Sequence, residues 1–526
     1  MTLRASFLPI AVLAAFAAFP LRAEVKLSRV FTPHMVLQRE TPVPIWGTAA
    51  PGETVTVKFR DQEKTVTAGP DGKWKVKLDA LKPGGPDVLT IGDKQIDDVL
   101  VGDVWVGSGQ SNMDMDVTNY TANDPVLTGN ANAAYPKLRL LKKGANDVWQ
   151  ESTPETNVKF SALLFSFGLP LQKEIGVPVG LMVGAVGGTP SGYWLSEAMY
   201  RDDAACAEEV KKLAPTYKYD ELLEKYQVDK AKYDEEFKVW KPLADEAKKE
   251  DKKAPAAPRA PQPVGKAGEA NSGKIGQLFE TFIRPYVGYA IKGVVWDQGE
   301  SKTNIALVDQ YTLMGALIKG WRKDWGQGDF PFLYIEKPSG GGPAWDYANP
   351  VTEKADKFQP LPKDIPAPAP ADYSYELYLK IMQYPNTYMV TSLDLGSGTH
   401  PVNKSGYGVR AAQVALGAVY GGKNEIYGPL YASHKIEGDK VVISYTHTGK
   451  GLAFKNGDKL QGFMIAGADK KFVWADCEIK GNTVEVSSKS VPQPEAVRYA
   501  WANGFHWANL FNEDGLPAQP FRTDEW

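Results

Sequence analysis

Residues 104–113 of this chain are Val104-Trp105-Val106-Gly107-Ser108-Gly109-Gln110-Ser111-Asn112-Met113, or VWVGSGQSNM. An apolar run, which predicts a buried strand, ends abruptly at small residues, and a serine stands between two amides. Glycines in the turn let the backbone bend sharply and expose Ser111 with its own N–H available. A serine in a glycine-rich turn is more often structural, so its role depends on what other strand ends provide.

Four more apolar runs predict buried strands, at 181–186, 293–296, 331–335 and 388–393, and helix-like stretches separate them. Fully apolar strands that alternate with helices are typical of a parallel sheet covered on both faces. The central part of the chain is therefore predicted to be an α/β domain. In such sheets the chemistry takes place beyond the carboxyl ends of the strands.

Period-two alternation predicts a β region on each side of this domain. ETVTVKF at 53–59 and KWKVKL at 73–78 each place apolar side chains on one face. They predict an N-terminal β-sandwich over 24–98. Alternation returns later in the chain and predicts a C-terminal β domain over 422–526, which leaves 99–421 for the α/β domain.

A charged insert interrupts the α/β domain at about 199–262 and ends in a Pro-rich stretch. Apolar residues recur in it at helical spacing: Leu222, Tyr226, Tyr233, Phe237 and Trp240. We expect an amphipathic helix laid on the surface of the domain. The alternatives are a lid and a partner-binding arm.

Residues 1–23 have the pattern of a signal peptide. Arg4 precedes an apolar stretch that is short for a bilayer span of about 20 residues, and Ala23 precedes the predicted cleavage point. We expect a secreted or periplasmic protein with no membrane contact after cleavage. The net charge of −3 gives no basic footprint for nucleic acid.

Metal-binding motifs are absent from the sequence. Cys206 and Cys477 are the only cysteines, and neither C-x-x-C nor H-E-x-x-H occurs. We therefore expect no metal. The sequence does not decide whether the two cysteines pair.

Three later strand ends supply what a nucleophilic serine lacks. The Gly187-Gly188 turn can bring backbone N–H groups close to a bound oxygen. Gln298 provides a neutral amide for an oxyanion hole. His400 is the only one of the five histidines predicted at this edge of the sheet. Glu300 is interpreted as a structural hydrogen-bonding residue, because a carboxylate beside an oxyanion would oppose catalysis.

The four motifs GSGQSNM, AVGGTP, WDQGES and THPVNK resemble, in this order, the sequence blocks of SGNH-type hydrolases. The likeness is greatest to the sialate O-acetylesterase family of carbohydrate esterases. HMVLQRETPVPIWGTA near the start and ANLFNEDGLPAQPFRTDEW at the end are similar to that family's flanking regions. The resemblance implies an SGNH-hydrolase-like three-layer parallel sheet, flanked by N- and C-terminal β-sandwich-like regions.

The resemblance also implies a reaction. Ser111 would be the nucleophile, His400 the base, and the Ser111 N–H, the Gly188 N–H and the Gln298 side chain the oxyanion hole. Acetyl groups would be removed from sugar hydroxyls through a serine acyl-enzyme, with no cofactor. The substrate would be an O-acetylated carbohydrate, either a sialic acid or a polysaccharide such as acetylated xylan. An inactive, carbohydrate-binding relative of such esterases is the alternative from another class.

One motif departs from the pattern. Many SGNH enzymes place an aspartate three residues before the histidine, where this chain has Ser397. Asp394 is the nearest carboxylate and is predicted to orient His400. The alternatives are a backbone carbonyl, which would leave a Ser–His dyad, and Glu300.

Overall fold

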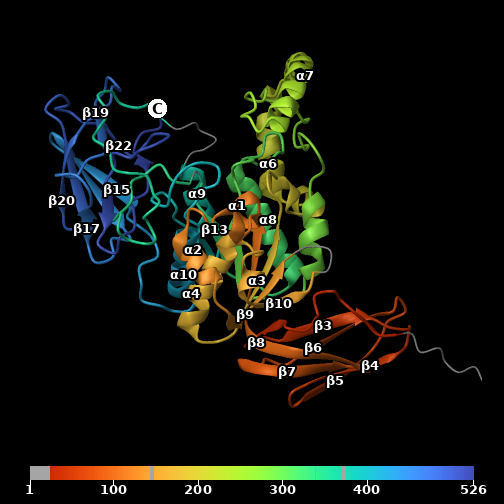
Figure 1. Ribbon diagram of the computed structural model, residues 1–526. Coiled ribbons are helices and arrows are strands. Elements are labelled where there is room, and N and C mark those ends of the chain that lie inside the picture. The colour runs from red at the N-terminus through yellow and green to blue at the C-terminus, as the bar shows by residue number, and fades with distance from the viewer. Residues whose placement is uncertain (1–23, 143–146, 338, 369–374) are drawn as a thin grey trace, which may run out of the picture.

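The computed structural model describes residues 24–142, 147–337, 339–368 and 375–526 (Figure 1). The predicted signal peptide, residues 1–23, lies outside these ranges. Within them, no helix is both long enough and apolar enough to cross a membrane.

A central sheet runs through the middle of the molecule. Its strands, in spatial order, are β10 (Trp149–Ser152), β9 (Tyr135–Lys142), β11 (Val179–Ala185), β8 (Lys94–Gly109), β12 (Gly293–Asp297), β13 (Phe332–Ile335) and β14 (Thr387–Val390). All neighbours pair in parallel except β10, which is antiparallel to β9. The expected α/β class is confirmed, and the sheet is mixed rather than purely parallel.

Different helices cover the two faces of this sheet. Side chains of β12 alternate between two cores: Val294 and Trp296 pack with α8 (Gln310–Trp325), whereas Val295 packs with α4 (Ala162–Ile175) and α10 (Lys404–Val419). The remaining α-helices are α1 (Ser111–Asp114), α2 (Pro125–Ala131), α3 (Pro154–Asn157), α5 (Glu197–Arg201), α6 (Ala204–Leu213), α7 (Tyr219–Lys249) and α9 (Tyr375–Ile381). Short 3-10 or π turns are η1 (Val117–Asn119), η2 (Ser191–Tyr193), η3 (Ala214–Thr216), η4 (Phe279–Ile283) and η5 (Arg284–Tyr286).

The N-terminal β region consists of two sheets, and β8 joins the second of them to the central sheet. The first contains β1 (Lys26–Leu27), β3 (Val43–Thr48) and β6 (Lys73–Leu78); the second contains β4 (Thr54–Phe59), β5 (Gln62–Thr67), β7 (Gly84–Ile91) and β2 (Val36–Gln38) together with β8. Residues 94–102 of β8 pair with β7 and β2, and residues 103–109 pair with β11 and β12. The boundary predicted between residues 98 and 99 therefore lies inside one continuous strand.

The C-terminal β region has its own hydrophobic core and lies to one side of the central sheet (Figure 1). One sheet contains β15 (Leu430–Glu437), β16 (Lys440–Thr446), β21 (Thr483–Ser487) and β20 (Asp476–Lys480). The others contain β17 (Leu452–Phe454) with β23 (Leu510–Asn512), and β19 (Val473–Trp474), β18 (Phe463–Ala466), β22 (Ala496–Tyr499) and β24 (Phe521–Arg522).

The charged insert contains the expected helix, but the helix does not lie on the domain surface. α7 has 31 residues, none of them buried, and projects away from the central sheet (Figure 1). Its aromatic side chains contact one another instead: Phe237 lies 5.6 Å from Tyr233 and 5.3 Å from Trp240, between ring centroids. The indole N–H of Trp240 donates to the carbonyl of Pro255 in the returning Pro-rich segment (2.9 Å). The expected placement was therefore wrong, because the apolar stripe finds partners within the insert.

Cys206 and Cys477 are both unpaired thiols.

A buried carboxyl group connects the central sheet to the C-terminal region. Glu336 follows β13 and is 1% exposed. Its Oε2 accepts hydrogen bonds from the Ser392 N–H (3.3 Å) and from Nε2 of Gln519 (3.1 Å). Burial raises the pKa of Glu336 to about 8.

Glu336→Gln tests this environment through the pH dependence of stability. In the unfolded chain the carboxyl group ionises near pH 4.5, but in the folded chain it keeps its proton to about pH 8. Folded wild type therefore loses stability as the pH rises through this interval, whereas the neutral variant does not. Calorimetry should show the Tm difference growing in favour of Glu336→Gln from pH 4.5 to pH 8. The same change at the exposed Glu174 should give no such trend, and a constant difference at position 336 would contradict the buried neutral state.

Candidate active site

Ser111 and His400 lie 289 positions apart in the sequence and are hydrogen-bonded, with 2.9 Å between Ser111 Oγ and His400 Nε2. Ser111 is the first residue of α1 and follows β8 directly after Gln110. His400 lies in the loop between β14 and α10. The structure thus brings the predicted nucleophile and base together at the carboxyl edge of the sheet.

The turn before Ser111 requires glycine at position 109. Gly109 has φ of +129°, and an added Cβ would lie 2.0 Å from the carbonyl oxygen of Asp297. The next N–H, of Gln110, donates to that same carbonyl (2.9 Å). Close approach to β12 therefore sets the direction in which the chain enters α1.

A cavity of about 810 Å³ opens at the serine. It is lined by Gln110, Ser111, Gly187, Gly188, Glu300, Ser301, Lys337, Ser339, Gly398, Thr399 and His400. The glycine turn passes directly beside the nucleophile, since a Cβ on Gly187 would lie 3.4 Å from that of Ser111.

Two backbone N–H groups at this cavity have no hydrogen-bond acceptor among the described residues. Ser111 occupies the first position of α1, where an N–H has no partner in the helix. The Gly188 N–H is the second, and φ of +70° there favours glycine. The Gly187 N–H, in contrast, donates to Asp114 Oδ2 (3.1 Å).

The structure does not bring the Gln298 amide to the cavity. Its Nε2 donates to the carbonyls of Thr189 (3.1 Å) and Lys302 (3.4 Å), and its Oε1 accepts from the Ser191 hydroxyl. Both ends of this buried amide are already hydrogen-bonded to the protein. The structure therefore does not place Gln298 as the predicted donor to an oxyanion. Gln298 instead supports the turn that contains Gly188, through its hydrogen bond to the Thr189 carbonyl.

Asp394 is likewise placed away from its predicted partner. Its carboxylate accepts two hydrogen bonds from Arg410 of α10, from Nη1 (3.1 Å) and Nη2 (2.9 Å), and both side chains are buried. A planar guanidinium matches a carboxylate in this two-bonded geometry. The expectation that Asp394 orients His400 is therefore corrected. Among the described residues, no carboxylate is hydrogen-bonded to the His400 ring.

Glu300 has the structural role that was expected. Its carboxylate accepts from Gln110 Nε2 (2.6 Å) and Asn112 Nδ2 (2.9 Å), the two amides that flank Ser111. The Lys337 ammonium lies 2.6 Å from Glu300 Oε1. Glu300 thus holds the residues on both sides of the nucleophile.

Buried lysines complete the underside of the site. Lys337 Nζ also lies 2.8 Å from Asp297 Oδ1. Burial opposes ionisation of Glu300, yet the Lys337 ammonium holds the pKa of Glu300 below its usual value. Burial also raises the pKa of Asp297 and lowers the pKa of Lys404 to about 7.

Three residues of this site were not predicted from the sequence: Asn112, Lys337 and Lys404. Asn112 and Lys404 stand inside the motifs GSGQSNM and THPVNK, from which only the neighbouring serine and histidine were predicted to act. Lys337 could have been predicted from the sequence, because it closely follows the apolar run 331–335 and so lies at the same edge of the sheet as the other motifs.

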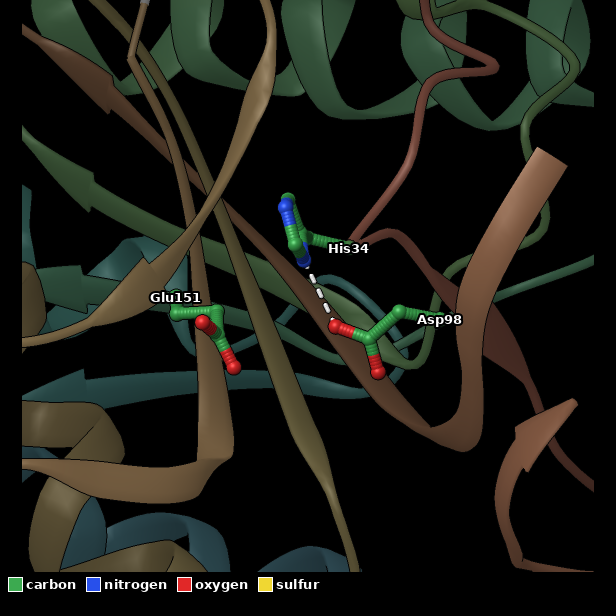
Figure 2. Close-up of side chains that lie close together, drawn as sticks. All are labelled: His34, Asp98 and Glu151. Carbon is green, nitrogen blue, oxygen red and sulfur yellow. Dashed lines mark hydrogen bonds and ion pairs between the residues drawn. The ribbon is translucent and has the colours of Figure 1, made fainter.

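One group of potential metal ligands lies elsewhere, between the N-terminal region and the central sheet. Candidate ligand atoms of His34, Asp98 and Glu151 lie within 4.8 Å of one another (Figure 2). Arg139 already donates from Nη2 to both oxygens of Asp98 (3.0 and 2.9 Å). Because this guanidinium neutralises the carboxylate, we assign the group to an ion-pair network.

The fold and the site define an α/β protein with a serine–histidine pair at the carboxyl edge of its sheet. No family model matches the chain. The sialate O-acetylesterase of Homo sapiens is 27% identical over 93% of this chain and 90% of its own length, and that of Rattus norvegicus is 27% identical over 93% and 92%. The crystal structure of a carbohydrate acetylesterase from Xanthomonas citri has 27% identity and a TM-score of 0.71, covering 96% of this chain and all of its own. This chain is thus similar to the sialate O-acetylesterases over nearly its whole length.

Arg410→Met tests the buried ion pair of Asp394. The variant leaves a buried carboxylate without its counterion, which costs about 3–5 kcal/mol of unfolding free energy. Adding Asp394→Asn should restore part of the loss, because it removes that charge. Urea unfolding measures both effects, and Arg259→Met on the exposed insert should change stability by less than about 0.5 kcal/mol. Unchanged stability in Arg410→Met would contradict the pairing.

Proposed function

We propose that this chain is a carbohydrate O-acetylesterase that acts through Ser111 and His400. The observation that carries the proposal is the 2.9 Å hydrogen bond between Ser111 Oγ and His400 Nε2 beside a cavity. The substrate class comes from the relatives, which are named as sialate O-acetylesterases and as a carbohydrate acetylesterase.

In the first half of the reaction, Ser111 Oγ attacks the acetyl carbonyl while His400 Nε2 accepts the serine proton. Negative charge develops on the carbonyl oxygen, and the N–H groups of Ser111 and Gly188 are the donors available to stabilise it. When the tetrahedral intermediate breaks down, the sugar oxygen leaves with the proton from His400. The acetyl group remains on Ser111.

In the second half, His400 removes a proton from water, and the resulting hydroxide attacks the acetyl-serine carbonyl. The same two N–H groups stabilise the second oxyanion, acetate leaves, and Ser111 regains its proton from His400. No carboxylate of the described residues is hydrogen-bonded to the other ring nitrogen of this histidine. Asp394 is engaged with Arg410, and Glu300 with Gln110, Asn112 and Lys337.

We further propose that the helix-covered central sheet corresponds to the three-layer SGNH-hydrolase arrangement. The β regions over 24–98 and 422–526 are proposed to be scaffolds for the domain over 99–421. Residues 1–23 are proposed to direct export to the periplasm or the outside of the cell.

The second candidate substrate is a neutral acetylated polysaccharide, such as acetylated xylan. Among the described residues that line the cavity, Lys337 is the only lysine or arginine, and it lies between Asp297 and Glu300. A sialic acid carboxylate would find no unpaired lysine or arginine in this lining. Release of acetate from O-acetylated sialosides, compared with acetylxylan, distinguishes the two substrates.

Ser111→Ala tests the nucleophile with p-nitrophenyl acetate as the chromogenic ester. We expect kcat/KM to fall by at least about 10³-fold, because the acyl-enzyme cannot form. Ser433→Ala on the exposed face of β15 is the control and should retain the wild-type rate. Equal rates in wild type and Ser111→Ala would overturn the serine mechanism, and no activity in wild type would favour a binding protein.

A further inference from the structure

Asn112, the residue after the nucleophile, is completely buried and has both ends of its amide engaged. Nδ2 donates to Glu300 Oε1 (2.9 Å) and to the carbonyl of Thr399 (3.0 Å). Oδ1 accepts from Lys404 Nζ (2.8 Å). Since the NH₂ group faces two acceptors and the oxygen faces the Lys404 Nζ donor, the partners determine the orientation of this amide.

These bonds hold the backbone on both sides of His400. The carbonyl that precedes the histidine, that of Thr399, accepts from Asn112. The carbonyl of Pro401, the residue after the histidine, accepts from Lys404 Nζ (2.7 Å), and Lys404 also donates to Asn112. The peptide group that precedes the base, and the peptide group one residue beyond it, are therefore both tied to Asn112, the second through Lys404.

The loop needs this support because little else holds the histidine. His400 is exposed, and among the described residues its ring is hydrogen-bonded to Ser111 alone. The approach to it contains two glycines with positive φ, Gly396 (+94°) and Gly398 (+93°), which place few restrictions on the backbone. Ser397 gives one further anchor through its hydroxyl, which donates to Asp356 (3.1 Å).

We propose that Asn112 is a positioning residue that couples the nucleophile turn to the His400 loop. It sets the distance between Ser111 Oγ and His400 Nε2 through the backbone, in place of a carboxylate on the histidine ring. The inference rests on the proposed serine mechanism. Glu300 holds the other hydrogen of the Asn112 NH₂ group and so fixes the amide relative to β12.

Asn112→Asp is the most direct test. The aspartate has the size of asparagine and keeps an oxygen for Lys404, but it replaces the NH₂ donor with an acceptor that faces two other acceptors. The Thr399 carbonyl is then released, and the His400 loop is free to move. A displacement of about 1 Å in such a site costs about 100-fold in rate.

The readout is the rate at which a fluorophosphonate probe modifies Ser111, measured across the pH range in which histidine titrates. This reaction needs the Ser–His pair but no carbohydrate. We expect Asn112→Asp to lower the rate constant by about 100-fold and to flatten its pH dependence, because deprotonation of a displaced His400 no longer activates the serine. A loss of stability alone would scale the rate with the folded fraction and leave the pH profile unchanged.

Asn157→Asp is the matched control. Asn157 is also fully buried, and its Nδ2 also donates to two backbone carbonyls, those of Ala131 (3.2 Å) and Ala133 (2.9 Å). It lies in α3, away from the cavity lining. We expect this control to lose stability while the probe reacts with its folded fraction at the wild-type rate.

Lys404→Met provides a second variant in case Asn112→Asp does not fold. It releases the Pro401 carbonyl and removes the donor to Asn112 Oδ1, but it keeps the bond from Asn112 to the Thr399 carbonyl, so we expect a smaller loss in probe reactivity, about 10-fold. If wild type and Ser111→Ala react equally with the probe, the proposed serine mechanism fails. If wild type reacts at Ser111 but the folded fractions of Asn112→Asp and Asn157→Asp react equally, the positioning role alone is overturned.

Discussion

The pairing of β8 determines where the nucleophile lies. Its residues 103–109 pair with β11, and residues 105–109 also pair with β12 on the other side, up to Gly109 before the turn. Gly109 then approaches the backbone of Asp297 so closely that no side chain fits between them. The position of Ser111 is consequently determined by main-chain contacts of β8 and of the turn. The glycine turn and the amides around the serine are arranged about this fixed point.

Beneath Ser111, Lys337 forms ion pairs with Asp297 and Glu300, and burying these charged groups costs folding free energy. Lys337 is 2% exposed and Asp297 is fully buried, so water stabilises neither. Replacement of buried ion pairs by apolar residues is often neutral or stabilising in proteins. Here the charges hold two amides that flank the serine, and Lys404 holds the loop of the base. The cluster therefore connects the end of β12, the nucleophile turn and the His400 loop.

The sequence predicted well what depends on local pattern. Apolar runs identified β8, β11, β12, β13 and β14 of the central sheet but missed β9 and β10. The rule for carboxyl ends selected Ser111 and His400 from many serines and five histidines. The sequence did not predict the hydrogen-bond partners of Asp394 and Gln298, because those partners depend on which side chains lie nearby in space. Arg410 on α10 and Ser191 in η2 are the partners, and neither was visible as such in the motifs. The placement of the insert was predicted wrongly for a similar reason. Helical spacing predicted α7, but it did not show that Trp240 of this helix contacts the Pro-rich segment.

The continuity of β8 also constrains the order in which the molecule is assembled. During synthesis, the first half of the strand finds β2 and β7 already present in the nascent chain. The second half must wait for β11 and then for β12, which is made after the long charged insert. Until then its edges are unsatisfied and prone to pair with other chains. The turn at Ser111 therefore acquires its geometry late, and a shortened chain that ends before β12 would contain the nucleophile without a site around it.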